Sequence, residues 1–260
     1  MTRQVKFPEP SRMEEVPAYS VLSRYYNDVM DHIDYPYWAL YLSRVAEDHG
    51  KEYNRGIDFA CGTGSLAREL MELGYDMVGV DGCAEMIEKA KLIKPIPGRK
   101  IKFDVCDLRE LPLVPKQQLG ICVYDSLNYL MYDEDVLDFF AIARETLEND
   151  GLLVVDLSTQ QNSKDHFNGY VVEEEVQGAV YRRQTQYDPD ERIQHNIFEI
   201  YPDNEDVMYY EHHQQRIWSI SHILELMKKE GFRNTNIYHE MTLRPGGEKS
   251  NRVHIAAEPV

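Results

Sequence analysis

The most regular hydrophobic pattern in the chain lies between residues 56 and 157, where short apolar runs alternate with amphipathic stretches. The apolar runs have the length of buried strands and cover residues 56–60, 77–81, 101–106, 120–124 and 152–157. The stretches with helical spacing of apolar residues cover 65–73, 84–92 and 134–147. Alternation of this kind predicts a mostly parallel sheet with helices on both faces.

The segment from about Met13 to Gly50 predicts two N-terminal helices. In the first, apolar residues recur close to helical spacing at Val16, Tyr19, Leu22, Tyr26 and Met30. The second covers Tyr37 to Glu47, and Gly50 is a suitable stop.

The alternation breaks after residue 168. Residues 169–218 are rich in β-branched and aromatic residues and are interrupted by turn signals at 177–178, 188–190 and 203–204. This segment predicts an antiparallel meander of about four strands. A helix from about Ile220 to Glu230 and two strands, at 235–239 and 252–257, follow as the end of the sheet.

These patterns combine into one domain over residues 1–260 with an α/β fold. We expect a Rossmann-like, seven-stranded, mostly parallel sheet formed by residues 51–168 and 219–260. The N-terminal helices (13–50) precede this core, and the antiparallel β insertion (169–218) interrupts it.

Composition narrows the choice of partners. The net charge of -17 repels phosphate backbones and therefore disfavours nucleic acid. The four cysteines are widely spread and form no Cys-x-x-Cys pair, so they indicate neither a metal site nor a disulfide framework. The opening segment MTRQVKFPEP has no apolar signal-peptide core, and no run could span a bilayer. We expect a cytoplasmic protein with no membrane contact, and the sequence assigns no oligomeric state.

A glycine-containing turn joins the first apolar run of this region to the helix that starts near Ser65. Gly62 and Gly64 have no Cβ, so the backbone there can turn tightly and a ligand can lie against it. The helix offers unpaired N–H groups and a positive dipole end to a negatively charged group. Together with Ala67, the two glycines also satisfy the dinucleotide pattern G-x-G-x-x-[GA], so the turn alone fits a nicotinamide cofactor as well.

Two acids follow at the ends of the next apolar runs. Asp81 lies roughly twenty residues after the first glycine, where a carboxylate suits the hydroxyls of a ribose. Asp107 is expected at the same edge of the sheet, where it can accept a hydrogen bond from an adenine amino group. The three features predict a crevice for a nucleotide-containing cofactor.

The segments DFACGTG (58–64), MVGVD (77–81) and DVCDL (104–108) resemble the first three motifs of class I S-adenosylmethionine-dependent methyltransferases. The acid Asp58 before the glycine turn is typical of that family, whereas dinucleotide enzymes usually lack it. The resemblance runs from about Tyr19 to Ala257 and includes ICVYDSLNYL as the fourth strand with its loop. It implies S-adenosylmethionine as the cofactor. The implied cofactor-binding residues are Asp58, Ala60, Gly62, Gly64, Asp81, Met86, Asp107, Leu108 and Asp125.

The N-terminal segment resembles a bacterial and archaeal small-molecule-type subgroup of the family. Tyr26-Asn27 and Asp34 to Trp38 are similar to its "YD…DY..W" pattern, although Asn27 replaces the more usual Asp. The resemblance adds Tyr26 and Trp38 to the cofactor side. In that subgroup an antiparallel meander covers the substrate pocket, so residues 169–218 are expected to cover the active site.

The loop after the fourth strand carries the candidate catalytic residues, Asp125 and Tyr129. The DNA-amino motif is absent, because Ser126 and Leu127 occupy its proline positions. Cys122 has no Pro-Cys context, which argues against a covalent pyrimidine mechanism. We therefore expect methyl transfer to a small molecule. Two alternatives remain at this point: a nicotinamide-dependent Rossmann oxidoreductase and a non-catalytic cofactor-binding partner subunit.

Overall fold

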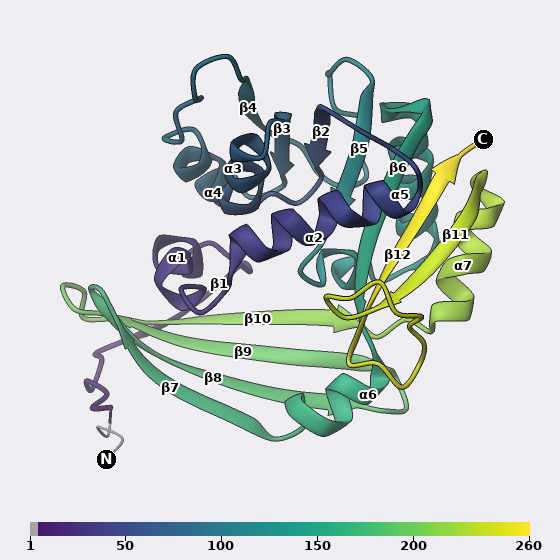
Figure 1. Ribbon diagram of the computed structural model, residues 1–260. Coiled ribbons are helices and arrows are strands. Elements are labelled where there is room, and N and C mark those ends of the chain that lie inside the picture. Colours follow the sequence, from purple (N-terminus) through teal and green to yellow (C-terminus); the bar gives the residue numbers. More distant parts are fainter. Residues whose placement is uncertain (1–4) are drawn as a thin grey trace. The chain divides into compact units, whose positions relative to one another are not determined.

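The computed structural model describes residues 5–260, so the first four residues of the opening segment lie outside the described residues. The chain divides into two compact units, each built from two separate stretches of sequence (Figure 1). The meander unit contains the residues up to Ile33 and Ser163–Gln215, and the core unit contains Asp34–Asn162 and Arg216–Val260.

The core unit is built on a seven-stranded sheet in the order β11-β12-β6-β5-β2-β3-β4. Its strands are β2 (Arg55–Asp58), β3 (Asp76–Asp81), β4 (Ile101–Val105), β5 (Gln117–Cys122), β6 (Leu147–Ser158), β11 (Phe232–His239) and β12 (Arg252–Pro259). Strands β2 to β6 pair in parallel, and β12 pairs antiparallel with both β6 and β11. The predicted mostly parallel sheet with a terminal hairpin is confirmed.

Helices cover both faces of this sheet, as the alternation predicts. They are α2 (Tyr35–Asp48), α3 (Ser65–Glu72), α4 (Ala84–Ala90), α5 (Asp133–Thr146) and α7 (Ile220–Lys229), with the short segments η2 (Ser126–Tyr129) and α6 (Gln160–Asn162). Helices α2 and α3 contact each other, and α5 contacts α7. Within residues 5–260, no helix is long and apolar enough to cross a membrane.

Local sequence signals explain where α2 begins and where α7 begins and ends. Asp34 caps α2 by accepting a hydrogen bond from the Tyr37 backbone N–H at 2.9 Å. Ser219 caps α7 by accepting from the His222 backbone N–H at 3.3 Å. Gly231 follows α7 with φ +81°, a left-handed conformation that glycine adopts without a Cβ clash. The predicted end of this helix is therefore confirmed.

The core of this unit is dominated by side chains from β6 and α5. Residues 152–155 and Leu157 of β6 are fully buried, as expected for a central strand covered on both faces. Phe139 of α5 packs edge-to-face against Phe59, with ring centroids 5.5 Å apart. This contact packs α5 against the end of β2, which pairs in parallel with β5, and the loops that follow those two strands form the candidate site.

The meander unit is a five-stranded sheet in the order β1-β10-β9-β8-β7. Its strands are β1 (Met13–Val16), β7 (Tyr170–Val176), β8 (Ala179–Asp188), β9 (Ile193–Pro202) and β10 (Met208–Arg216). The short segments η1 (Leu22–Arg24), α1 (Tyr26–Val29) and η3 (Ser163–Phe167) belong to the same unit. Each of the three predicted turn signals lies between consecutive strands, so the predicted four-stranded meander is confirmed.

The predicted first N-terminal helix is wrong. Met13–Val16 form β1, which pairs in parallel with β10, and only short helical segments follow. Pro17 explains the difference, because proline disfavours helical backbone in the residue before it. Tyr19 then adopts φ +65°, which also interrupts a helix. The apolar spacing at Val16 and Leu22 reflects packing against the meander sheet rather than a continuous helix.

Candidate active site

Four parallel strands of the core unit bring the candidate residues to one edge of the sheet. Asp58 and Asp81 are the last residues of β2 and β3. Asp107 follows β4 by two residues, and Asp125 follows β5 by three. The strand order reverses between β2 and β5, and crevices at such a reversal are the usual ligand sites of open α/β sheets.

The Asp81 carboxylate ties the glycine turn to the end of β3. Its Oδ2 accepts a hydrogen bond from the Gly62 backbone N–H at 2.8 Å, and its Oδ1 accepts from the Cys83 N–H at 2.8 Å. Burial raises the pKa of Asp81, and the two backbone donors partly oppose that rise. A carboxylate has about four acceptor positions, so two remain for a pair of ligand hydroxyls.

The glycine turn depends on the absence of side chains. Gly62 and Gly64 have φ +52° and +80°. A Cβ on Gly64 would lie 2.7 Å from the Phe103 ring and 2.9 Å from Ile93, so no other residue fits without a shift of these side chains. Gly64 is also the N-cap of α3 and provides no side-chain cap, so the turn leads directly into the positive end of the helix.

Asp58 is a buried carboxyl with an unused acceptor. Its side chain is 2% exposed, and its Oδ1 has no hydrogen-bond partner among residues 5–260. Burial raises its pKa to about 7; the Ala60 N–H lowers it, and the charge of Asp81 raises it further. A cationic ligand would relieve the cost of ionising this group. The unused acceptor therefore fits the positively charged S-adenosylmethionine.

Asp107 is held by a residue that the sequence analysis did not single out. Arg109 donates to Asp107 through its Nε at 2.7 Å, its Nη2 at 3.0 Å and its backbone N–H at 2.9 Å. These bonds lower the pKa of Asp107, so the carboxylate stays ionised. Leu108 packs partly buried against the core, and Met86 of α4 is buried. Their roles at an adenine ring stay predictions.

The loop after β5 is strained. Tyr124 and Asp125 are consecutive non-glycine residues with φ +63° and +60°, a conformation that costs about 1–3 kcal/mol per residue. The buried Asp156 carboxylate holds both, accepting from the Tyr124 N–H at 2.9 Å and the Asp125 N–H at 2.8 Å. Arg252 donates to Asp156 and forms a 2.7 Å ion pair with Asp125. Strain held in this way at the edge of a sheet is typical of functional loops.

An aromatic group from α2 lies against this loop. The Trp38 ring packs on the Tyr124 ring with centroids 4.6 Å apart. The Tyr35 ring also lies near Tyr124, with centroids 6.0 Å apart. Trp38 also packs edge-to-face against His254, with ring centroids 5.3 Å apart. Burial lowers the pKa of His254 to about 3, so its imidazole is neutral. The structure thus brings the predicted residues Trp38 and Asp125 into one neighbourhood.

Two other predicted residues have different surroundings. Tyr129 lies in η2, after the strained loop. Its neighbour Asn128 binds the Arg216 carbonyl and the Ser158 N–H through its side chain, so Asn128 has a structural role. Tyr26 lies in α1 of the meander unit, with its ring 6.0 Å from Tyr19. The roles of Tyr129 and Tyr26 stay predictions.

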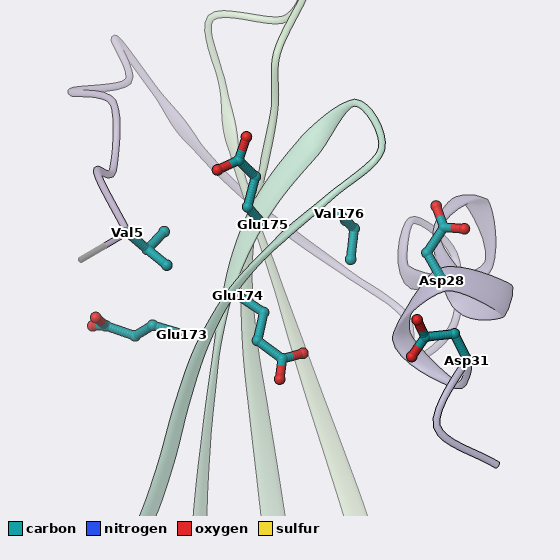
Figure 2. Close-up of a pocket in the computed structure, with 7 residues that line it drawn as sticks. All are labelled: Val5, Asp28, Asp31, Glu173, Glu174, Glu175 and Val176. Atoms are coloured by element: carbon teal, nitrogen blue, oxygen red, sulfur yellow. The ribbon is translucent and has the colours of Figure 1, made fainter. Parts of the chain in front are cut away.

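The meander unit also contains an acidic pocket of about 380 Å³. It is lined by Val5, Asp28, Asp31, Glu173, Glu174, Glu175 and Val176. Figure 2 shows that these carboxylates point in different directions rather than toward one centre. Glu173 pairs with Arg182, and Glu174 accepts from the Tyr181 hydroxyl. In the described part of the chain no group of three or more His, Cys, Asp or Glu could hold a metal ion.

The sequence is similar to known methyltransferases. Residues 57–151 match a family model described as a methyltransferase domain. YqeM of Bacillus subtilis (strain 168), named provisionally as a methyltransferase, is 26% identical over 92% of this chain and 96% of its own length.

Solved structures share the fold over nearly the whole chain. An S-adenosylmethionine-dependent methyltransferase from Clostridium acetobutylicum ATCC 824 has a TM-score of 0.78 at 17% identity, covering 93% of this chain and 98% of its own. The sugar N-methyltransferase KedS8 from Streptoalloteichus sp ATCC 53650 has a TM-score of 0.71 at 15% identity, covering 100% and 98%. The common architecture therefore includes the meander as well as the Rossmann-like sheet.

Proposed function

Because this chain is a class I S-adenosylmethionine-dependent methyltransferase, we propose that its methyl acceptor is a small molecule. One observation carries the proposal: the fold shared with the sugar N-methyltransferase KedS8 extends over 100% of this chain, so it includes the meander. The net charge of -17 supports it, because a strongly acidic surface disfavours polyanionic acceptors. The match of residues 57–151 to a methyltransferase domain favours this function over a nicotinamide oxidoreductase, and the label-transfer experiment below distinguishes it from a non-catalytic cofactor-binding subunit.

We assign the cofactor contacts to the residues at the carboxyl edge of the core sheet. S-adenosylmethionine supplies a methyl group on a positively charged sulfur. Asp81 would bind the ribose hydroxyls through its remaining acceptor positions, and Asp58 would balance positive charge through its unused Oδ1. Asp107 and Leu108 would contact adenine. Gly62 and Gly64 form the turn that leads into α3, and the ligand would lie beside that turn.

The residues of this chain promote transfer mainly by positioning the acceptor, since the methyl carbon is already activated. Asp125 is the candidate for orienting the nucleophile, because Asp156 and Arg252 fix both its backbone and its carboxylate. Tyr129 is the second candidate. The ion pair with Arg252 suits Asp125 as a fixed hydrogen-bond acceptor. The prediction that residues 169–218 cover the active site stays a prediction.

The acceptor class can be tested by following label from tritiated S-adenosylmethionine into separated fractions of a bacterial extract. We expect label in the small-molecule fraction. The Asp81→Ala variant serves as a control and should transfer little label. Label that accumulates in tRNA, DNA or protein would contradict the small-molecule proposal.

A further inference from the structure

One face of the meander sheet changes from apolar to polar along its strands. Tyr181 of β8 lies opposite Ile200 of β9 at the apolar end, where both belong to a hydrophobic cluster with Leu22. Two pairs further along the same face, Thr185 lies opposite Asn196. Thr185 and Asn196 are each 3% exposed, so the polar end is buried as well. Buried polar side chains on a sheet face carry a cost unless they are paired.

The polar side chains form one connected hydrogen-bond network. Asn196 Nδ2 donates to Gln215 Oε1 at 3.0 Å, and Gln194 Nε2 donates to the same oxygen at 3.2 Å. The Ser163 hydroxyl donates to Gln194 Oε1 at 2.9 Å. Each amide is therefore held in one orientation by its partners.

Arg183 belongs to this network but has no carboxylate partner among the described residues to balance its charge. Its Nη2 donates to Asn196 Oδ1 at 2.7 Å, and its guanidinium lies over the rings of Phe167 and Phe198, 5.4 and 5.6 Å from their centroids. The Arg183 Nε is buried and has no hydrogen-bond partner among residues 5–260. No carboxylate in that part of the chain forms an ion pair with it, although the chain carries 45 Asp and Glu residues.

The neighbouring arginine shows what is unusual. Arg182 points to the opposite face of β8 and pairs with Glu173 at 2.9 Å and Glu199 at 3.0 Å. The two adjacent arginines therefore differ in their ion pairs: among residues 5–260 Arg182 has two carboxylate partners, and Arg183 has none.

We propose that Arg183, with Asn196 beside it, binds an anionic group, a carboxylate or a phosphate, at the polar end of the meander sheet. The Nε–H and Nη2–H edge of a guanidinium matches two oxygens of such a group and gives paired, charge-assisted hydrogen bonds. Asn196 holds the guanidinium in place through Nη2, and Phe167 and Phe198 limit its movement.

Anion binding is tested on the full chain by thermal unfolding in sodium phosphate or sodium acetate, at ionic strength matched with sodium chloride. We expect the unfolding midpoint of the wild type to rise by about 2–4 °C at saturating anion. Arg183→Gln should lose the rise, because glutamine can still donate to Asn196 but has no charge and no fork. Arg182→Gln is the matched control and should respond as the wild type does. An equal rise in Arg183→Gln, or no rise in the wild type, would overturn the site.

Discussion

Asp58 provides a sharp test of the electrostatics at the cofactor end of the sheet. Burial raises its pKa from the ordinary 3.8 to about 7, a difference worth about 4 kcal/mol. The folded protein therefore holds this proton more tightly than the unfolded chain does. Stability from this group falls as the pH rises from about 4 to about 7 and is constant above that range.

Asp58→Asn removes this dependence, since the amide stays neutral at every pH. The stability gained by the variant relative to the wild type should grow by about 2–3 kcal/mol between pH 5 and pH 8. Comparing two pH values cancels any constant effect of the altered hydrogen bonding. In a chain of this size the gain corresponds to a difference in unfolding midpoint of roughly 5–10 °C.

The measurement is urea and thermal unfolding of both proteins without cofactor at pH 5, 6, 7 and 8. Asp104→Asn is the matched control, because the Asp104 side chain is exposed on β4, two strands away from β2 in the same sheet, and pairs with Lys102. Its stability relative to the wild type should not change in this way. If the difference in free energy of unfolding between Asp58→Asn and the wild type stays constant from pH 5 to pH 8, the buried carboxyl is not the unfavourable charge inferred from its surroundings.

Three further changes test the other parts of the site. Asp81→Ala should weaken S-adenosylhomocysteine binding by about 1.5–3 kcal/mol in calorimetry, and wild-type affinity would show that it is not the ribose ligand. Gly64→Ala should lower the free energy of unfolding by about 2–4 kcal/mol, because φ is +80° and the added Cβ meets Phe103 at 2.7 Å; unchanged urea unfolding would contradict this. Arg252→Met should destabilise the protein by about 3–5 kcal/mol, because it leaves Asp156 buried and unpaired. A variant as stable as the wild type would show that this ion pair holds nothing in place.

The sequence pattern predicts most of the core unit because the relevant signals are local. Apolar runs, glycine turns and caps such as Ser219 act within a few residues, so the strands and helices follow from neighbouring positions. The same holds for Asp58 and Asp81, which are the last residues of their strands. What can be inferred in this way includes the parallel sheet and the residues that surround the glycine turn.

The parts that the sequence does not predict depend on distant partners. Asp156 lies inside an apolar run and has the appearance of an ordinary strand residue; its role appears only when β12 brings Arg252 beside it, 96 positions later. The strand Met13–Val16 likewise requires β10, and nothing in its own four residues indicates that pairing. Arg182 and Arg183 are adjacent and look alike in the sequence. They can be told apart only in the structure, where they point to opposite faces of β8 and, among the described residues, only Arg182 forms ion pairs.

The pairing of β1 with β10 has a consequence for synthesis of the protein. Met13 pairs with Met208, 195 positions later (208 minus 13), so β1 leaves the ribosome roughly 10–40 s before its partner at ordinary elongation rates. Strand β6 is also synthesised long before one of its partners, because β12, which pairs with it, ends at Pro259. Neither unit can close until most of the chain has been made, and the open edge of β6 is exposed meanwhile to pairing with other nascent chains. The order of the strands therefore leaves both sheets incomplete until late in synthesis.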